Sequence, residues 1–140
     1  MKKYGCGIIC GSFDVIHPGY IRMFKDAKRV CNTLTVALQG DPTIDRPEKC
    51  LPVQSISDRI EILESMRYID KIILYNTEDE LDKLLGTEEY DVRILGTDYK
   101  GRDDYTGAHY GKAVYFHERN HDYSTTALKK KIARSMVGKT

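Results

Sequence analysis

Short apolar runs alternate with longer amphipathic segments along this chain, and this alternation limits its fold more than any other feature. Five runs predict strands, at 4–13, 33–40, 71–75, 91–96 and 113–117. The segments between and after them predict helices over 18–31 and 125–136, and helices that begin at 55 and 77. Strands that alternate with helices are typical of a parallel sheet with helices on its faces. We therefore predict an α/β fold, a small doubly wound Rossmann-like sheet of about five strands.

Local signals fix some of the helix ends. Ser55 with Asp58, and Thr77 with Glu80, have the spacing of a capping box at a helix start. Gly86 is expected to stop the second of these helices. The segment 41–54 holds three of the four prolines and is expected to be a surface loop, which at that length is usually functional or mobile.

Composition excludes several classes of protein. The 22 Lys and Arg residues nearly balance the 21 Asp and Glu residues, so the overall charge does not indicate a nucleic-acid-binding protein. The four cysteines show no paired CxxC spacing, which argues against a zinc site. An apolar stretch of about 18 residues, as a membrane span needs, is absent. We expect a cytoplasmic protein with no membrane or nucleic-acid partner.

The segment "GSFDVIHPGY" (11–20) predicts a phosphate site. It follows the first strand, and ligands bind beyond the carboxyl ends of the strands in such sheets. Gly11 lets the backbone approach a ligand, and Asp14 and His17 can contact it. The helix that begins near Pro18 points its free N–H groups toward any anion there.

A second polar segment, "RNHDYSTT" (119–126), places three hydroxyl residues at another helix start, with Arg119 before them. This pattern suits the outer phosphates of a nucleoside triphosphate, although "STT" alone is also an ordinary helix cap. The lysines at 129–131 are expected to form a solvated helix face.

These two segments resemble the signatures of the cytidylyltransferase family of nucleotidyltransferases, G-[TS]-F-D-x-x-H-x-G-H and R-T-E-G-I-S-T-T, and above all its glycerol-3-phosphate branch in bacteria. "RYID" (67–70) and "GTDY" (96–99) are similar to the family's R-Y-V-D and G-D-D-W. The resemblance covers nearly the whole chain, so residues 1–140 are expected to form a single nucleotidyltransferase domain.

The resemblance implies an enzyme in which an alcohol phosphate attacks the α-phosphorus of CTP, with Mg²⁺, to give pyrophosphate and a CDP-alcohol. It assigns catalysis to His17, Lys49 and Arg119, and acceptor binding to Asp41 and Arg67. Nucleotide binding is assigned to Gly11, Ser12, Phe13, Asp14, Gly19, Tyr20, Gly96, Asp98, Arg119, Ser124, Thr125 and Thr126. Asp14 either orients the first loop or contacts Mg²⁺. The family also implies a homodimer.

Two departures from the signatures leave alternatives open. Tyr20 stands where the family has the second histidine of H-x-G-H, and a tyrosine carries no positive charge at neutral pH. "NHDY" replaces T-E-G-I and introduces His121, which we hypothesise partly replaces the missing imidazole. The alternatives are an adenylyltransferase of the same fold, making an ADP-sugar or a flavin nucleotide, and a non-catalytic nucleotide-binding paralogue.

Overall fold

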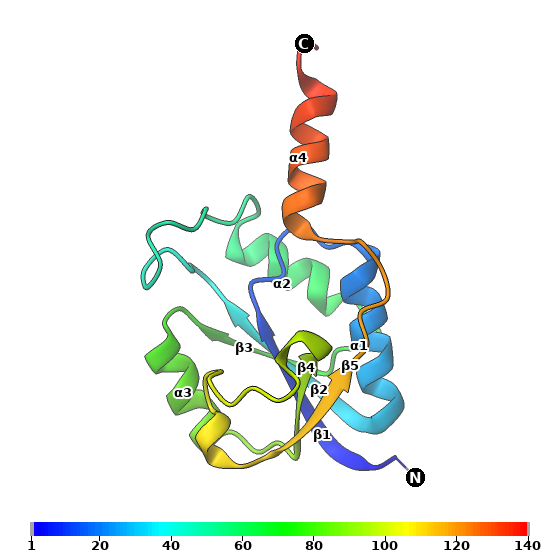
Figure 1. Cartoon of the computed structure of the whole chain (residues 1–140), viewed down its shortest axis with the longest axis vertical. Helices are drawn as coiled ribbons and strands as arrows, with labels where there is room; N and C mark the ends of the chain where they lie inside the picture. The colour runs from blue at the N-terminus through cyan, green and yellow to red at the C-terminus, as the bar shows by residue number, and fades with distance from the viewer. Residues whose placement is uncertain (1, 140) are drawn as a thin grey trace.

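The computed structural model describes residues 2–139 and contains one parallel sheet with helices around it (Figure 1). Its strands are β1 (Tyr4–Gly11), β2 (Cys31–Gln39), β3 (Lys71–Tyr75), β4 (Val92–Gly96) and β5 (Ala113–His117). They lie in the order β3-β2-β1-β4-β5, and all neighbours are parallel. The order changes direction between β1 and β4, which is where ligands bind in such folds. The predicted fold class is confirmed.

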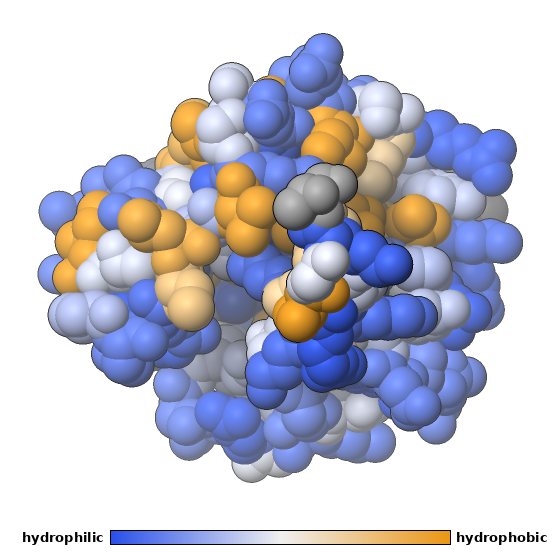
Figure 2. All heavy atoms as spheres, turned by 90° about the horizontal axis from the view of Figure 1, so that it is seen from above, coloured by the Kyte–Doolittle hydropathy of each residue, from blue (hydrophilic) through white to orange (hydrophobic). Residues whose placement is uncertain are grey.

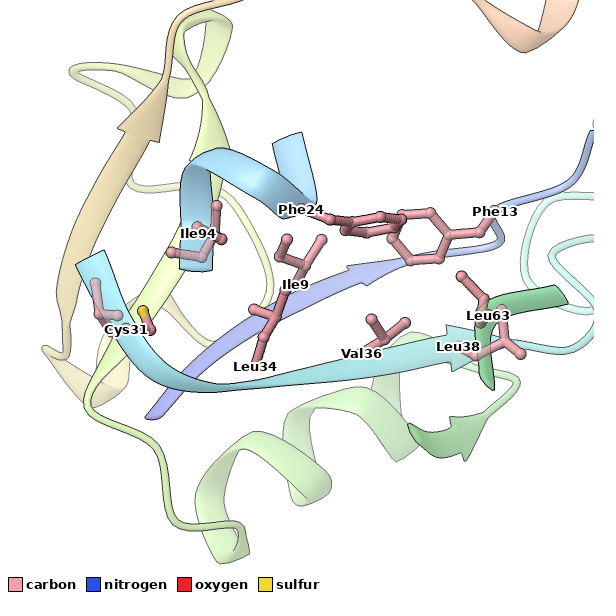
Figure 3. Packing of buried hydrophobic residues seen from close by; sticks show 11 residues of the cluster. Ile9, Phe13, Phe24, Cys31, Leu34, Val36, Leu38, Leu63 and Ile94 are labelled. Carbon is pink, nitrogen blue, oxygen red and sulfur yellow. The ribbon is translucent and has the colours of Figure 1, made fainter. Parts of the chain in front are cut away.

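Helices cover both faces of the sheet. α1 (Pro18–Val30) and α2 (Ile56–Glu64) pack on one face, where Ile9, Phe24, Val36 and Leu63 belong to one buried cluster (Figure 3). α3 (Glu78–Thr87) packs on the other face, with Leu81, Leu84 and Leu85 in a second cluster that includes Ile8. Neighbouring residues of β1 therefore serve opposite faces, as a strand buried on both sides requires.

α4 (Thr125–Met136) leaves the compact body and extends away from it (Figure 1). None of its residues is buried. Its first two turns contact the polar segments at the carboxyl edge of the sheet, through the hydroxyl of Thr125 and the ammonium of Lys129. No helix within residues 2–139 has the length and apolar character needed to cross a membrane.

The structure corrects several predicted ends, and two of these corrections have a clear physical reason. β1 stops at Gly11 rather than at 13, because Phe13 and Val15 adopt φ angles of 47° and 49° and turn the chain sharply. α3 runs past Gly86 to Thr87, so the predicted stop is wrong. A side chain at Gly86 would meet the Tyr110 hydroxyl at 2.5 Å, so this glycine makes room for the short helical turn Ala108–Tyr110 against α3.

The predicted helix starts are found. Thr77 and Glu80 form the complete capping box of α3. Ser55 caps α2 by accepting a hydrogen bond from the Asp58 N–H at 3.1 Å. α1 begins at Pro18, where proline is favoured in the first turn.

Candidate active site

The sharp turn after β1 is held by the buried carboxylate of Asp14. Its Oδ1 accepts a hydrogen bond from the Gln54 N–H at 3.0 Å, and its Oδ2 accepts one from Val53 at 2.7 Å. Lys129 of α4 pairs with Oδ2 at 2.7 Å, so this lysine is not the solvated residue we expected. Asp14 thus ties the 41–54 loop and α4 to the turn.

The ionisation of Asp14 reflects these contacts. Burial alone would raise its pKa, but the Lys129 ammonium and the two backbone N–H donors outweigh burial and lower the pKa. The carboxylate is therefore ionised at neutral pH, and its charge is compensated within the protein.

His17 is the N-cap of α1 and is 8% exposed. Its Nδ1 accepts the Gly19 N–H at 3.1 Å, so in the neutral ring the proton lies on Nε2. Burial, helped by the nearby His121 and Arg119, lowers the pKa of His17. The ring is thus a neutral donor with a fixed orientation, able to hydrogen-bond a phosphoryl oxygen through Nε2.

Tyr20 connects the two signature segments. Its ring stacks on His17 with centroids 4.2 Å apart, and its edge meets Phe13. The Thr125 Oγ1 lies 3.2 Å from the Tyr20 hydroxyl and 3.0 Å from the Asp14 carbonyl oxygen. The residue that replaces the family's second histidine therefore joins α1 to the start of α4.

The first turns of α1 and α4 carry no acidic residue, whereas α3 carries three. Acidic residues at a helix start compensate the positive end of the helix dipole, so α1 and α4 leave that end available to an anion. Ser124 caps α4 by accepting from the Ala127 N–H. Both helix starts can therefore bind phosphate.

The segment before α4 folds onto the start of α1. Tyr123 stacks against His17 with centroids 5.9 Å apart, and its N–H donates to the Nδ1 of His121 at 3.1 Å. A side chain at Gly19 would meet the Cε1 of His121 at 2.5 Å and the ring of His17 at 2.8 Å. Gly19 thus allows the two imidazoles to lie together over the helix start.

A cavity of about 220 Å³ lies between the two helix starts. It brings together eight of the predicted residues: His17, Gly19, Tyr20, Gly96, Asp98, Arg119, Ser124 and Thr125. We call it the nucleotide cavity.

A second cavity, of about 540 Å³, opens beside the first, and both are lined by Tyr20, Met23, Gly96 and Tyr99. It contains the predicted residues Gly11, Ser12, Phe13 and Lys49. Four cationic side chains line it, from Arg46, Lys49, Arg93 and Arg102, against the two carboxylates of Glu78 and Asp104. The excess of positive charge suits an anionic ligand. We call this space the acceptor cavity after the role proposed for it below, although Gly11, Ser12 and Phe13 were predicted to bind the nucleotide.

Two predicted acceptor residues lie elsewhere. Arg67 stacks on its neighbour Tyr68 and precedes β3, so it lies toward the amino edge of the sheet, opposite the two cavities. Asp41 accepts hydrogen bonds from Thr43 and lines a third cavity, of about 700 Å³, beside α2 and β3. Neither signature segment lines that third cavity. The geometry of this single chain does not support an acceptor role for Arg67 or Asp41.

Two more predicted nucleotide residues lie beside the cavities. Thr126 is exposed in the first turn of α4, where its N–H can still face an anion. Asp14 was also predicted as a magnesium ligand, but both of its oxygens are already engaged. Within residues 2–139 no three His, Cys, Asp or Glu side chains are grouped to hold a metal. Mg²⁺ often binds mainly through substrate phosphates and water, and such binding needs no group of three protein ligands.

Two buried polar residues that line these cavities, His117 and Arg93, were not predicted from the sequence. Arg93 had a signal in the sequence, because it is a charged residue within the otherwise apolar run "VRILG", and its neighbours Val92 and Ile94 are buried in the structure. His117 ends a strand and had none, since its partner Asp26 is 91 residues away.

Comparison with known proteins identifies the family of this chain. A family model described as "Cytidylyltransferase-like" matches residues 8–131. The "Bifunctional protein HldE" of Hyphomonas neptunium is 32% identical over 138 residues, 95% of this chain, and that of Helicobacter pylori is 30% identical over 126 residues, 89% of this chain. The chain spans 27% of the length of each of these two relatives.

Among solved structures, the lipopolysaccharide core biosynthesis protein from Thermoplasma volcanium GSS1 is similar, with a TM-score of 0.64 and 22% identity. The match covers 86% of this chain and 99% of that one, and it supports the fold alone. The family model and the relatives go further, because each covers most of this chain, and the family model includes both signature segments. The chain therefore belongs to the cytidylyltransferase-like family of nucleotidyltransferases.

Proposed function

We propose that this protein transfers a nucleotidyl group from CTP, or alternatively ATP, to a small phosphorylated alcohol or sugar. The observation that carries the proposal is the junction of the two cavities. One is lined by His17 and two helix starts, the other by an excess of cationic side chains, and they share the wall that includes Tyr20 and Gly96. A triphosphate in the first can thus meet a phosphate ester in the second.

In the proposed reaction an oxygen of the acceptor phosphate forms a bond to the α-phosphorus. The bond from that phosphorus to the oxygen bridging it to the β-phosphorus breaks, and pyrophosphate leaves with the electron pair. The Nε2–H of His17 donates to an oxygen on the α-phosphorus, where charge develops. Arg119 and the start of α4 hold the outer phosphates. The protein contributes position and charge stabilisation, and no covalent intermediate is needed.

His117 supports a donor whose base carries an amino group. Its Nδ1 lies 2.7 Å from the Oδ2 of Asp26, and its Nε2 is buried without a hydrogen-bond partner among the described residues. With the proton on Nδ1, held by the carboxylate, Nε2 is an acceptor. Cytosine and adenine each offer an exocyclic amine to such an acceptor, whereas uracil and guanine present a carbonyl at the same position of the ring.

We accordingly expect CTP and ATP to support pyrophosphate release at least about tenfold better than UTP and GTP, since a mismatched buried polar pair costs roughly 1–3 kcal/mol. His117→Phe should remove most of this preference. The measurement is pyrophosphate release with the four triphosphates side by side. Equal rates with CTP and UTP in the wild-type protein would contradict the role given to His117.

The same assay tests the transfer itself against a panel of phosphorylated polyols and sugars. We expect release that depends on the acceptor for at least one member of the panel. If CTP or ATP binds with magnesium but no acceptor induces release, the proposal fails and the protein is a non-catalytic nucleotide-binding paralogue.

We also propose a homodimer, which the family resemblance implies. Exposed apolar side chains support it, on the 41–54 loop (Ile44, Leu51, Val53) and on the extended end of the chain (Ile132, Met136, Val137). Seen from the carboxyl end, hydrophobic areas interrupt the otherwise polar surface (Figure 2). Light scattering of the full chain should give twice the 16.0 kDa of one chain. A 16.0 kDa species at micromolar concentration would exclude the dimer.

A further inference from the structure

Two arginines are buried in this protein, and only one of them is satisfied. Arg59 is 2% exposed and donates to four backbone carbonyls, those of Gln54, Ser12, Gln39 and Gly40. Arg93 is 5% exposed, yet within residues 2–139 it makes one hydrogen bond, from Nη1 to the Thr106 carbonyl at 2.7 Å. Its Nε is buried and has no partner there. Most of the five N–H donors of this guanidinium are thus unused.

The charge of Arg93 is also uncompensated. No carboxylate of the described residues lies within ion-pair distance of it. The carboxylate of Glu78, which lines the same cavity, accepts instead from the Thr106 hydroxyl at 2.6 Å. The ring of Tyr105, whose centroid lies 5.3 Å from the guanidinium carbon, gives it a cation–π contact. A buried, unpaired charge is costly unless a partner completes it, so Arg93 points to an anionic ligand.

Arg93 lies at the end of the acceptor cavity that is far from His17. In the sheet it pairs with Ile8, so its side chain points to the face covered by α3. α1 and the nucleotide cavity lie on the opposite face of the sheet. Tyr20 and Met23 of α1 pack against the buried cluster of that face and also line the cavity. The acceptor cavity therefore extends from the α1 side, over the strand ends, to Arg93 on the α3 side.

We propose that the natural acceptor carries a second anionic group, distinct from the reacting phosphate, and that Arg93 binds it. This inference rests on the proposed function, since it takes the reacting phosphate to lie beside the nucleotide cavity. The second group is a carboxylate or another phosphate at the opposite end of the acceptor. A guanidinium suits either one, because two of its N–H groups can donate in parallel to two oxygens.

The test is kcat/KM for pyrophosphate release with three acceptors of one ring size: glucose 1-phosphate, glucuronic acid 1-phosphate and glucose 1,6-bisphosphate. At the carbon farthest from the 1-phosphate, glucose 1-phosphate carries a neutral hydroxyl, glucuronic acid 1-phosphate a carboxylate and glucose 1,6-bisphosphate a second phosphate. We expect the wild-type protein to prefer one of the charged acceptors by about tenfold or more, as a charge-assisted hydrogen bond implies. Which of the two is preferred identifies the group.

Two matched variants separate recognition from folding. Arg93→Gln keeps a donor for the Thr106 carbonyl but removes the charge, and Arg93→Lys keeps the charge. The glutamine variant should lose the preference, so that its kcat/KM ratio between the charged and the neutral acceptor falls about tenfold, and the lysine variant should keep part of it. Thermal midpoints and nucleotide affinity establish that both variants fold. If one variant does not fold, the role of Arg93 is judged from the other variant and from the wild-type ratio of kcat/KM between charged and neutral acceptors.

The failure of this inference can be told from the failure of the proposed function. If the wild-type protein uses the neutral acceptor as well as the charged ones and Arg93→Gln changes nothing, the second anion is excluded while transfer stands. If neither these three acceptors nor any member of the panel of phosphorylated polyols and sugars supports release, the proposed function fails. In that case calorimetric affinities of the same three compounds for the wild-type and Arg93→Gln proteins decide the role of Arg93. Equal affinities would overturn it.

Discussion

His17→Ala is expected to lower the rate of pyrophosphate release at saturating substrates by about 10²–10³-fold, the usual effect of removing one donor that stabilises developing charge. His17 is buried, its orientation is fixed by the Gly19 N–H, and Nε2 is its free donor. The measurement is the turnover rate of the variant with the best donor and acceptor pair, beside its affinity for the nucleotide.

His17→Asn is the matched control, because asparagine can still cap α1 by accepting the Gly19 N–H. It should keep the thermal stability of the wild-type protein and lose the rate, as His17→Ala does. His121→Ala tests whether the second imidazole contributes, and we expect a smaller loss. Unchanged turnover in His121→Ala would exclude that contribution. A wild-type rate in His17→Asn would exclude His17 as the donor.

Asp14→Ala is expected to destabilise the protein by about 3 kcal/mol, the lower end for breaking a buried ion pair. The substitution removes the acceptor for the Val53 and Gln54 N–H groups and leaves Lys129 unpaired. Urea unfolding monitored by circular dichroism gives the change in the free energy of unfolding.

Lys129→Met provides the comparison, because it removes only the ion pair and should cost less than Asp14→Ala.

The pH dependence of the free energy of unfolding gives an independent check. Lys129 and the backbone donors overcome burial and hold the pKa of Asp14 below its ordinary value of 3.8. This carboxylate therefore stabilises the fold fully above that value, and its contribution is lost as the pH falls through the lowered pKa. An Asp14→Ala protein as stable as the wild-type protein at pH 7 would show that the Asp14 carboxylate does not stabilise the fold.

The fold could be predicted because its signals are local. Strand and helix alternation, the box at Thr77 and Glu80, and the proline at the start of α1 each act over a few residues, and the structure shows all of them. The signature segments likewise meet where a parallel sheet places its loops. The prediction that Gly86 ends α3 is wrong, because this glycine leaves room for the side chain of Tyr110 rather than ending the helix.

What could not be predicted depends on partners distant in the sequence. The sequence predicts that Lys129 is solvated, because its partner Asp14 lies 115 positions earlier in the chain and only the fold brings the two together. In the sequence Tyr20 only replaces the family's second histidine, whereas in the structure its hydroxyl links α1 to Thr125. The incomplete bonding of Arg93 is visible only when the whole environment is known. These contacts decide which residues support the site and which remain free to bind.

The most direct test of nucleotidyl transfer follows the α-phosphorus of the donor. The protein is incubated with magnesium, a phosphorylated acceptor and CTP or ATP labelled at that phosphorus. We expect the label to move to a product in which the nucleotide is joined to the acceptor phosphate, with one pyrophosphate formed for each product molecule. Label recovered only in unreacted triphosphate or in free nucleoside monophosphate, whatever acceptor is present, would contradict it.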